Sequence, residues 1–150
     1  MPARRRAELA YPALLEAEVD GGFVVSFPDF GVGATQGDNT EEALDQAADL
    51  LETMVANYMA EGWDLPAPSA PGGRPLVRLA PLVAAKAEVY RAMRAAGISK
   101  AELARRIGIS PQQTQRLFDV RRASRLDQID AALAALGRRL VVMTEAAPAE

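Results

Sequence analysis

The sequence predicts an α+β N-terminal domain followed by an all-α domain that ends in a single strand. In residues 1–65, short stretches of alternating apolar residues precede one long stretch with helical periodicity. Residues 66–75 contain four prolines and two glycines, a composition typical of a loop or linker. From residue 81 onward, apolar residues recur at helical spacing. We therefore predict a first domain over residues 1–65, extended by a strand at 76–80, and a second over residues 81–145.

The N-terminal strands are predicted from alternation and turn chemistry. Residues 11–19 place an apolar side chain at every second position, which indicates one strand with an apolar face and a solvent-exposed face. Residues 20–22, Asp-Gly-Gly, favour a tight turn, and residues 23–27 resume the alternation, so the two segments should form a hairpin. Residues 30–37 contain three glycines and supply at most a short third strand, at about residues 33–36.

A long helix is predicted between Asn39 and Gly62. Asn39 is a favoured N-cap, Glu42 is placed for a capping box, and Gly62 is a stop signal. Trp63 follows, either as a packing residue that closes the helix end or as an anchor that faces a partner. The apolar stripe that should lie against the sheet comprises Leu44, Ala47, Ala48, Leu51, Met54, Val55 and Tyr58.

The remaining scaffold elements follow from the same signals. Residues 76–79 could return to the sheet as a strand, and Pro81 starts a helix that should end at Gly97. Ser124 is expected to cap a helix that runs to Leu136. Residues 138–144 have the composition of a strand, either an internal strand or the strand through which two copies pair. The inward face of the helix after Pro81 should comprise Leu82, Ala85, Val89, Ala92, Met93 and Ala96.

Residues 98–125 predict a helix-turn-helix. Ser99 can cap a first short helix, with Glu102 three residues later completing a capping box. Gly108 breaks that helix, Ser110 caps the next, and Pro111 occupies its first position. A turn this short sets the two helices at a steep angle.

The second of these helices carries side chains that suit DNA. The amide and guanidinium groups of Gln112, Gln113, Gln115 and Arg116 are of the kind that read base edges in the major groove. The cations of this segment outnumber Glu102 and Asp119, as a phosphate-binding surface requires; they are Lys100, Arg105, Arg106, Arg116, Arg121, Arg122 and Arg125. The alternative interpretation is a solvated basic helical hairpin.

Charge is divided sharply along the chain. Residues 7–73 contain thirteen Asp or Glu and no Lys or Arg, whereas residues 74–150 contain fourteen basic and seven acidic residues. The first part should attract a basic partner and the second a nucleic acid. The absence of Cys and His removes thiolate sites and the commonest general base. We expect no catalytic residues, no metal, no cofactor and no membrane contact, and a cytoplasmic location for a chain whose basic residues 4–6 lack a following apolar signal region.

The two parts together resemble a known family. Residues 11–30, YPALLEAEVDGGFVVSFPDF, and residues 37–54, GDNTEEALDQAADLLETM, look like the antitoxin of HicAB toxin–antitoxin systems. Residues 108–142, GISPQQTQRLFDVRRASRLDQIDAALAALGRRLVV, resemble the helix-turn-helix of XRE/Cro-type repressors that one branch of these antitoxins carries. The resemblance implies a partial RNase H-like β-β-β-α-β domain that binds and blocks a small basic ribonuclease, the HicA-type toxin. It also implies repression of the operon through DNA binding. Because one helix-turn-helix reads only a few base pairs, we expect a homodimer or a higher even oligomer.

The resemblance assigns roles to individual positions. Pro111, Gln112, Gln113 and Arg116 match the base-contacting face, to which the residue chemistry adds Gln115. The expected phosphate contacts are Ser99, Lys100, Arg121 and Arg122. The expected toxin contacts are Asp20, Asp29, Phe30 and Trp63. Thr114 departs from the Ile or Val that is usual in the family, which could loosen the packing of the helix.

Two other classes of function remain open from the sequence. The N-terminal domain could be a small-molecule sensor attached to an XRE-type regulator. It could also be an RNase H-like nuclease, but that chemistry needs several convergent carboxylates around two metal ions, for which Asp20 in a turn and Asp29 after a strand make a poor case.

Overall fold

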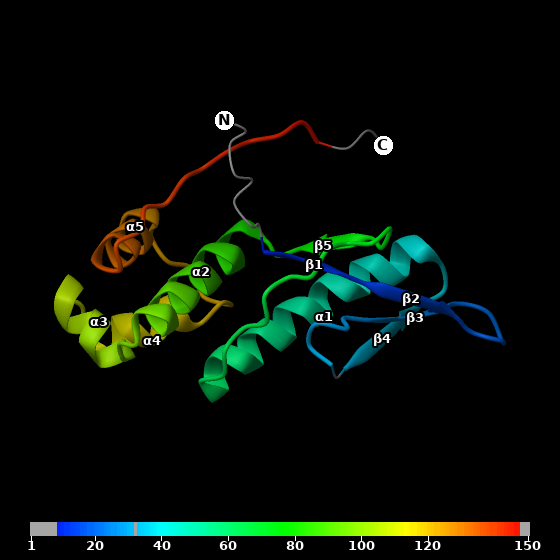
Figure 1. Cartoon of the computed structure of the whole chain (residues 1–150), viewed down its shortest axis with the longest axis horizontal. Helices are drawn as coiled ribbons and strands as arrows, with labels where there is room; N and C mark the ends of the chain where they lie inside the picture. The colour runs from blue at the N-terminus through cyan, green and yellow to red at the C-terminus, as the bar shows by residue number, and fades with distance from the viewer. Residues whose placement is uncertain (1–8, 32, 148–150) are drawn as a thin grey trace.

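Strands gather at one end of the molecule and short helices at the other (Figure 1). The structure is a computed structural model that describes residues 9–31 and 33–147. The basic residues 4–6 lie outside the described part of the chain. The mixed α+β class, with N-terminal strands followed by helices, is confirmed.

Within residues 9–31 and 33–147, five strands form two small antiparallel sheets. They are β1 (Ala10–Pro12), β2 (Leu14–Ala17), β3 (Phe23–Ser26), β4 (Ala34–Gly37) and β5 (Leu76–Arg78). One sheet has the order β2-β3-β4, and the other pairs β1 with β5. The predicted hairpin, the short third strand and the returning strand are all present.

The single strand predicted over residues 11–19 is wrong. The chain breaks it at Ala13, whose backbone N–H donates to the Pro75 carbonyl at 2.9 Å, so β1 and β2 pair with different partners. Strand β2 also stops at Ala17, and Val19 is fully exposed near the tip of the hairpin. The alternation of apolar residues could not show that the strand pairs with β5 before Ala13 and with β3 after it.

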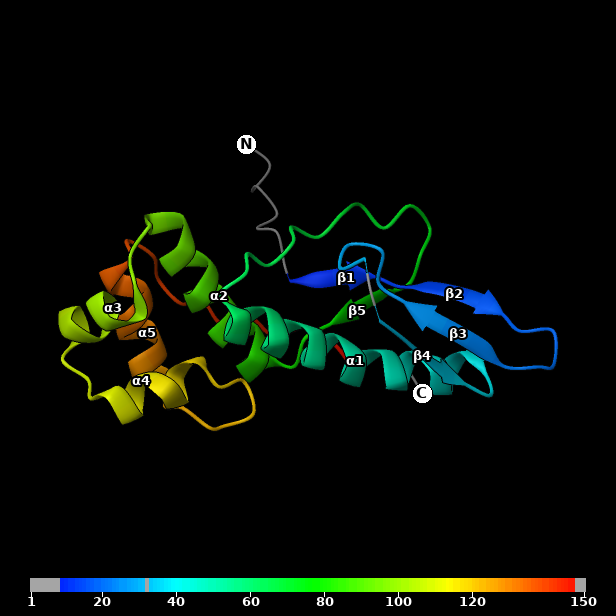
Figure 2. The same ribbon diagram turned by 90° about the horizontal axis from the view of Figure 1, so that it is seen from below.

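Helix α1 (Thr40–Glu61) packs across the sheet, as Figure 2 shows. The Asn39 side chain accepts the Glu42 backbone N–H at 2.8 Å, but the Glu42 carboxylate accepts the N–H of Asp38 and so does not form the expected capping box. Gly37 lets the helix start lie directly on β4, because a Cβ there would be 2.4 Å from the Ala43 nitrogen. The fully buried positions are Ala43, Ala47, Leu51, Met54, Val55 and Met59. The prediction that Ala48 faces inward is wrong, since its side chain is exposed.

Residues 66–75 form a loop that lies against the strand end of the molecule. The Tyr11 hydroxyl donates to the Pro66 carbonyl at 2.8 Å, and the Ser69 N–H donates to the Asp29 carboxylate at 3.0 Å. The loop therefore returns the chain to β1 in a fixed path, which places β5 beside β1.

After β5, the described part of the chain forms four more helices: α2 (Pro81–Ala96), α3 (Lys100–Ile107), α4 (Pro111–Phe118) and α5 (Leu126–Ala135). Helix α2 lies between α1 and the shorter helices and contacts α4 and α5. Its buried side chains are Val83, Lys86, Ala87, Val89, Tyr90, Ala92 and Met93. The inward face predicted for α2 was therefore rotated: Ala96 is exposed, and Leu82 and Ala85 are only partly buried.

Two predictions near the C-terminus are wrong. Ser124 does not cap α5, whose N-cap is Arg125, and the buried Ser124 hydroxyl has no hydrogen-bond partner within residues 9–31 and 33–147. Residues 138–147 form no strand; they run as an extended tail back over the strand end (Figure 1). Ion pairing between Arg78 and Glu145 holds that tail near β5.

One hydrophobic core extends through both ends of the molecule. It joins Val25 and Phe27 of the strand region to Val89 of α2 and to Leu117 and Ile129 of the short helices. No helix in the described part of the chain is long and apolar enough to span a bilayer.

Candidate functional site

The candidate site is built on α3 and α4, which their N-terminal caps hold in place. The Ser99 hydroxyl accepts the Glu102 backbone N–H at 3.1 Å. The Ser110 hydroxyl likewise accepts the Gln113 backbone N–H at 3.1 Å. Gly108 ends α3 with φ 71°, a left-handed conformation that favours glycine. The short turn between the helices is thus fixed on both sides.

Helix α4 buries one face and exposes the other. Leu117 and Phe118 lie in the core, and Thr114 is only 8% exposed. The Thr114 hydroxyl donates to the Ser110 carbonyl at 2.8 Å, so this buried polar group is satisfied within its own helix. The residues predicted to read bases are all exposed: Pro111, Gln112, Gln113, Gln115 and Arg116.

Gln113 already has a structural partner. Its side-chain oxygen accepts the Ser110 backbone N–H at 2.8 Å, which completes a capping box. A bidentate contact to adenine needs both the oxygen and the nitrogen of an amide. Gln113 can therefore read a base in this way only if the cap opens. Gln112 and Gln115 form no side-chain hydrogen bond within the described residues, and both keep their amides available.

The cations of this region divide into paired and unpaired groups. Glu102 binds both Arg105 and Arg106, which explains why it does not complete the capping box predicted with Ser99. Arg125 pairs with Asp127 at 3.0 Å. Within the part of the chain that the structure describes, four cations of residues 98–125 form no ion pair: Lys100, Arg116, Arg121 and Arg122. Three of these four are the predicted phosphate contacts, and Arg116 is a predicted base reader.

Lys100 and Ser99 both keep donors available at the start of α3. The Lys100 ammonium lies 5.1 Å from the centre of the Phe118 ring, a cation–π distance, and the lysine remains exposed. Phe118 in turn meets Tyr90 edge-on at 6.4 Å. The Ser99 hydroxyl oxygen accepts in the cap, but its hydrogen is left to donate outward.

An open groove of about 380 Å³ separates α4 from the second half of α1. Ala56, Asn57 and Ala60 line one side, and the polar residues Lys100, Gln115 and Arg121 line the other. The Arg121 guanidinium reaches across to the Thr53 hydroxyl at 3.4 Å. Part of the basic surface therefore faces α1.

Lys86 is a functional candidate that the sequence interpretation missed. This residue of α2 is completely buried, and its ammonium donates to three main-chain carbonyls at the end of α4 and in the turn after it. The available signal was its spacing: Lys86 lies three residues after Val83 and four before Tyr90, both of which are buried.

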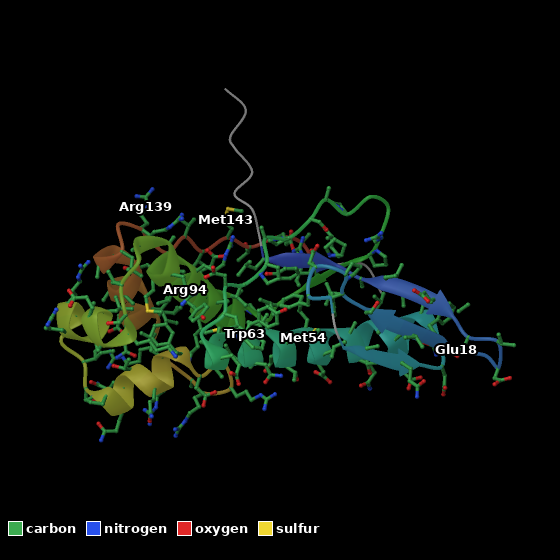
Figure 3. All side chains as sticks on the ribbon, turned by 60° about the horizontal axis from the view of Figure 1, so that its bottom comes forward. Glu18, Met54, Trp63, Arg94, Arg139 and Met143 are labelled. Carbon is green, nitrogen blue, oxygen red and sulfur yellow. The ribbon has the colours of Figure 1, made fainter. Side chains whose placement is uncertain are left out.

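Most exposed carboxylates in the described part of residues 7–73 lie along the β2–β3 hairpin and the outer side of α1. Asp20 is exposed in the hairpin turn, and Figure 3 shows Glu18 at the far end of the molecule. One carboxylate oxygen of Asp29 accepts a hydrogen bond from the Ser69 N–H. Phe30 is 4% exposed, its ring 4.9 Å from Tyr11, so it belongs to the core and offers no surface to a toxin in this structure. The exposed carboxylates of α1 are Glu41, Glu42, Asp45, Asp49 and Glu61.

Trp63 lies where α1 meets α2 (Figure 3). Its ring packs edge-on against Tyr58 at 5.3 Å, as a residue that closes the helix end would, and it stays 54% exposed. Its carbonyl accepts the Tyr90 hydroxyl at 2.8 Å, and burial raises the pKa of Tyr90. Next to it, Asp64 pairs with Arg94 at 2.8 Å. Within residues 9–31 and 33–147 there is no cluster of three His, Cys, Asp or Glu that could hold a metal ion.

Comparison with known proteins gives consistent similarities. The family of HicB-like antitoxins of bacterial toxin–antitoxin systems matches residues 10–88. Antitoxin HicB 1 of Photorhabdus laumondii subsp. laumondii is 35% identical, over 91% of this chain and 88% of its own. Antitoxin HicB of Pseudomonas fluorescens is 39% identical over 74% and 77%, and Antitoxin HicB of Escherichia coli K12 is 35% identical over 88% and 96%. A solved toxin–antitoxin complex from Streptococcus pneumoniae is 36% identical, with a TM-score of 0.39 over 41% of this chain and 45% of the other.

Proposed function

Because the chain belongs to the HicB-like antitoxin family, we propose that it neutralises a HicA-type ribonuclease toxin by direct binding and represses its own operon by binding operator DNA. The two activities use different parts of the chain. The acidic strand end and α1 bind the toxin, and α3 with α4 forms an XRE/Cro-type helix-turn-helix that binds DNA. The chain acts as a regulatory binding protein in the cytoplasm and not as an enzyme.

Charge supports the toxin-binding half of this proposal. In the described part of residues 7–73, every carboxylate except Asp64 is free of an ion pair. An unneutralised acidic surface attracts a basic partner at long range and raises the association rate. Asp20 and the exposed half of the Trp63 ring lie on accessible surface and remain proposed toxin contacts. The partial RNase H-like relationship of this half is part of the same proposal.

The observation that carries the DNA-binding half is the set of unpaired cations around α4. The family match ends at residue 88, so this half rests on the geometry of α3 and α4. Arg105, Arg106 and Arg125 are neutralised locally, whereas Lys100, Arg121 and Arg122 form no ion pair within the described residues and lie on the same part of the molecule as the exposed amides of Gln112 and Gln115. Free cations release counterions from DNA when they meet phosphates, and free amides read base edges. The coincidence of unpaired cations with exposed amides on one helix favours a DNA-binding surface over a solvated basic hairpin.

Association of two copies completes the proposed DNA reader. One helix-turn-helix reads only a few base pairs, so specificity needs two half-sites about 34 Å apart or a multiple of that spacing. The tail at residues 138–144 leaves Val141, Val142 and Met143 exposed at 47%, 73% and 85%. We propose that this segment pairs with its counterpart in a second copy to form a homodimer or a higher even oligomer.

The proposal is tested by comparing unpaired with paired cations on the same helices. The variant Lys100→Ala/Arg121→Ala/Arg122→Ala should bind the DNA upstream of its own gene more weakly, and its slope of log affinity against log salt should fall by roughly 0.9 per lost phosphate contact. The control Arg105→Ala/Arg106→Ala removes cations that Glu102 already neutralises and should change the slope less. Both variants should still block RNA cleavage by the toxin. Equal slopes for the two variants would contradict the proposed DNA surface.

A further inference from the structure

Lys86 makes an unusual set of contacts for a lysine. Its side chain is 0% exposed, and its Nζ donates to the Arg116 carbonyl at 2.6 Å, the Asp119 carbonyl at 2.8 Å and the Arg122 carbonyl at 2.6 Å. An ammonium group has three hydrogens, so every donor of Lys86 is used. A buried charge is costly unless it is paired or fully hydrogen-bonded, and here three carbonyl dipoles compensate it.

These contacts replace a cap that α4 lacks. Helices α1, α2 and α3 end at glycines with left-handed φ values, at Gly62, Gly97 and Gly108. Helix α4 ends instead at Asp119 with φ −92°, so no glycine motif satisfies its last carbonyls. A cation at a helix C-terminus also interacts favourably with the partial negative charge there. Lys86, which belongs to the neighbouring helix α2, therefore acts as a C-terminal cap of α4.

The three carbonyls belong to a short segment with two different roles in the proposed function. Arg116 is a base reader on α4, and Arg122 is a phosphate contact in the turn that follows. Because a single ammonium binds the backbone of both residues, the spacing between them depends on α2. The backbone N–H groups of Asp119 and Arg122 donate to the Arg116 and Asp119 carbonyls at 3.3 Å and 3.1 Å, so the same carbonyls also organise the turn internally.

We propose that Lys86 is a positioning residue for DNA recognition, which locks the base-reading helix and the phosphate-binding turn to α2 in one fixed relation. The inference rests on the proposed DNA-binding function and adds a residue that does not touch DNA itself. Burial lowers the pKa of Lys86, and the Asp119 carboxylate opposes that effect.

The test compares Lys86→Met with Val89→Ala in the full chain. Methionine keeps the length and volume of the lysine stem but removes all three donors. Val89 is equally buried on the same helix and makes none of these hydrogen bonds, so its truncation weakens the core without releasing the end of α4. Affinity for the upstream DNA and for random DNA is measured at a temperature where thermal melts show both variants folded, with active concentration set by toxin titration.

Lys86→Met should bind upstream DNA about tenfold more weakly than the wild type. The loss of the buried hydrogen bonds of the Lys86 ammonium is large enough to account for that factor. Its salt slope should fall by roughly one as the Arg122 contact is lost. Amide hydrogen exchange at Asp119 and Arg122 should accelerate in Lys86→Met and not in Val89→Ala. Lys86→Gln, whose amide can donate two hydrogen bonds, should recover part of the affinity.

Each contrary outcome identifies which statement fails. If the wild type binds the upstream DNA but Lys86→Met and Val89→Ala lose affinity equally, the positioning role is wrong and the proposed function stands. Unchanged exchange at Asp119 and Arg122 in Lys86→Met also overturns the positioning role. If the wild type shows no preference for the upstream DNA over random DNA, the proposed function itself fails, and the positioning role fails with it.

Discussion

Gln113 has two competing uses at the start of α4. Its side-chain oxygen closes the capping box with Ser110, and its position on the exposed face made it a predicted base reader. Gln112, one residue earlier, is exposed and forms no cap. The two glutamines therefore offer a matched pair for separating helix stability from DNA reading.

We predict that Gln113→Ala lowers the free energy of unfolding by about 1 kcal/mol, the usual net value of one intramolecular hydrogen bond, whereas Gln112→Ala leaves it unchanged. Thermal or urea unfolding measures this difference. Gln112→Ala should still weaken operator binding while sparing random DNA. A stability loss of the same size in both variants would show that the capping box is not formed in solution.

Tyr11 gives a prediction at alkaline pH. The residue is completely buried and donates to the Pro66 carbonyl, and burial raises the pKa of its hydroxyl from 10.0 to about 12, with smaller effects from Arg91, Asp29 and Glu88. The unfolded chain thus loses this proton at lower pH than the folded chain. The corresponding stability is fully present below pH 10 and is lost as the pH rises towards 12.

Stability measured between pH 9 and pH 12 should consequently fall more steeply in the wild type than in Tyr11→Phe, by up to about 3 kcal/mol. At pH 7 the wild type should be the more stable protein by about 1 kcal/mol, because Tyr11→Phe lacks the hydrogen bond to Pro66. Parallel curves for the two proteins across this range would contradict the raised pKa.

At the scale of elements, sequence patterns identified most helices because their signals are local. The caps at Asn39, Ser99 and Ser110 and the glycine stops at Gly62 and Gly97 all depend on residues within one turn of each other. The faces of α4 were also predictable, since Thr114 and Leu117 follow a short, strongly amphipathic pattern.

The elements that were predicted wrongly depend on contacts between residues that are distant in sequence. The break at Ala13 depends on a hydrogen bond to Pro75, and the rotation of α2 depends on α4, whose end accepts the Lys86 ammonium. A lysine on a buried face contradicts the usual polarity rule, so periodicity placed Val89, Ala92 and Met93 inward correctly but missed Lys86. Among the candidate site residues, exposure on α4 could be predicted. The pairing of Glu102 with Arg106 and the capping box of Ser110 with Gln113 are also local, within one helical turn, and were missed because the same side chains suit other roles.

The tail at residues 138–144 gives the prediction at this scale. It forms no strand in the single chain, so the internal-strand interpretation is wrong. Leu140 packs partly against the core, whereas Val141, Val142 and Met143 are exposed. We predict that Val142→Glu/Met143→Glu lowers the mass of the assembly measured by light scattering without lowering the melting temperature of the fold. Val19→Glu, at an exposed apolar position in the hairpin, is the control and should leave the mass unchanged. An unchanged mass in the double variant would reject the tail as the pairing segment.

At the scale of the whole molecule, the division of charge has a counterpart in the fold. In the described part of the chain, carboxylates without an ion pair extend along the hairpin and α1, and cations without an ion pair gather around α4. The hairpin and α4 lie at opposite ends of the molecule (Figure 1). The two surfaces approach each other at the groove between α1 and α4, where Arg121 reaches Thr53. Substitutions away from that groove should therefore affect one partner at a time.

The most direct measurement is the affinity of full-length variants for both proposed partners under identical conditions. Asp45→Lys/Asp49→Lys reverses charge on the exposed side of α1, and Arg116→Ala/Arg122→Ala removes unpaired cations at the opposite end. The first variant should lose toxin affinity, through a slower association rate, and keep operator affinity. The second should lose operator affinity and keep toxin affinity. If either variant weakened both partners equally while remaining folded, the separation of toxin binding from DNA binding would be wrong.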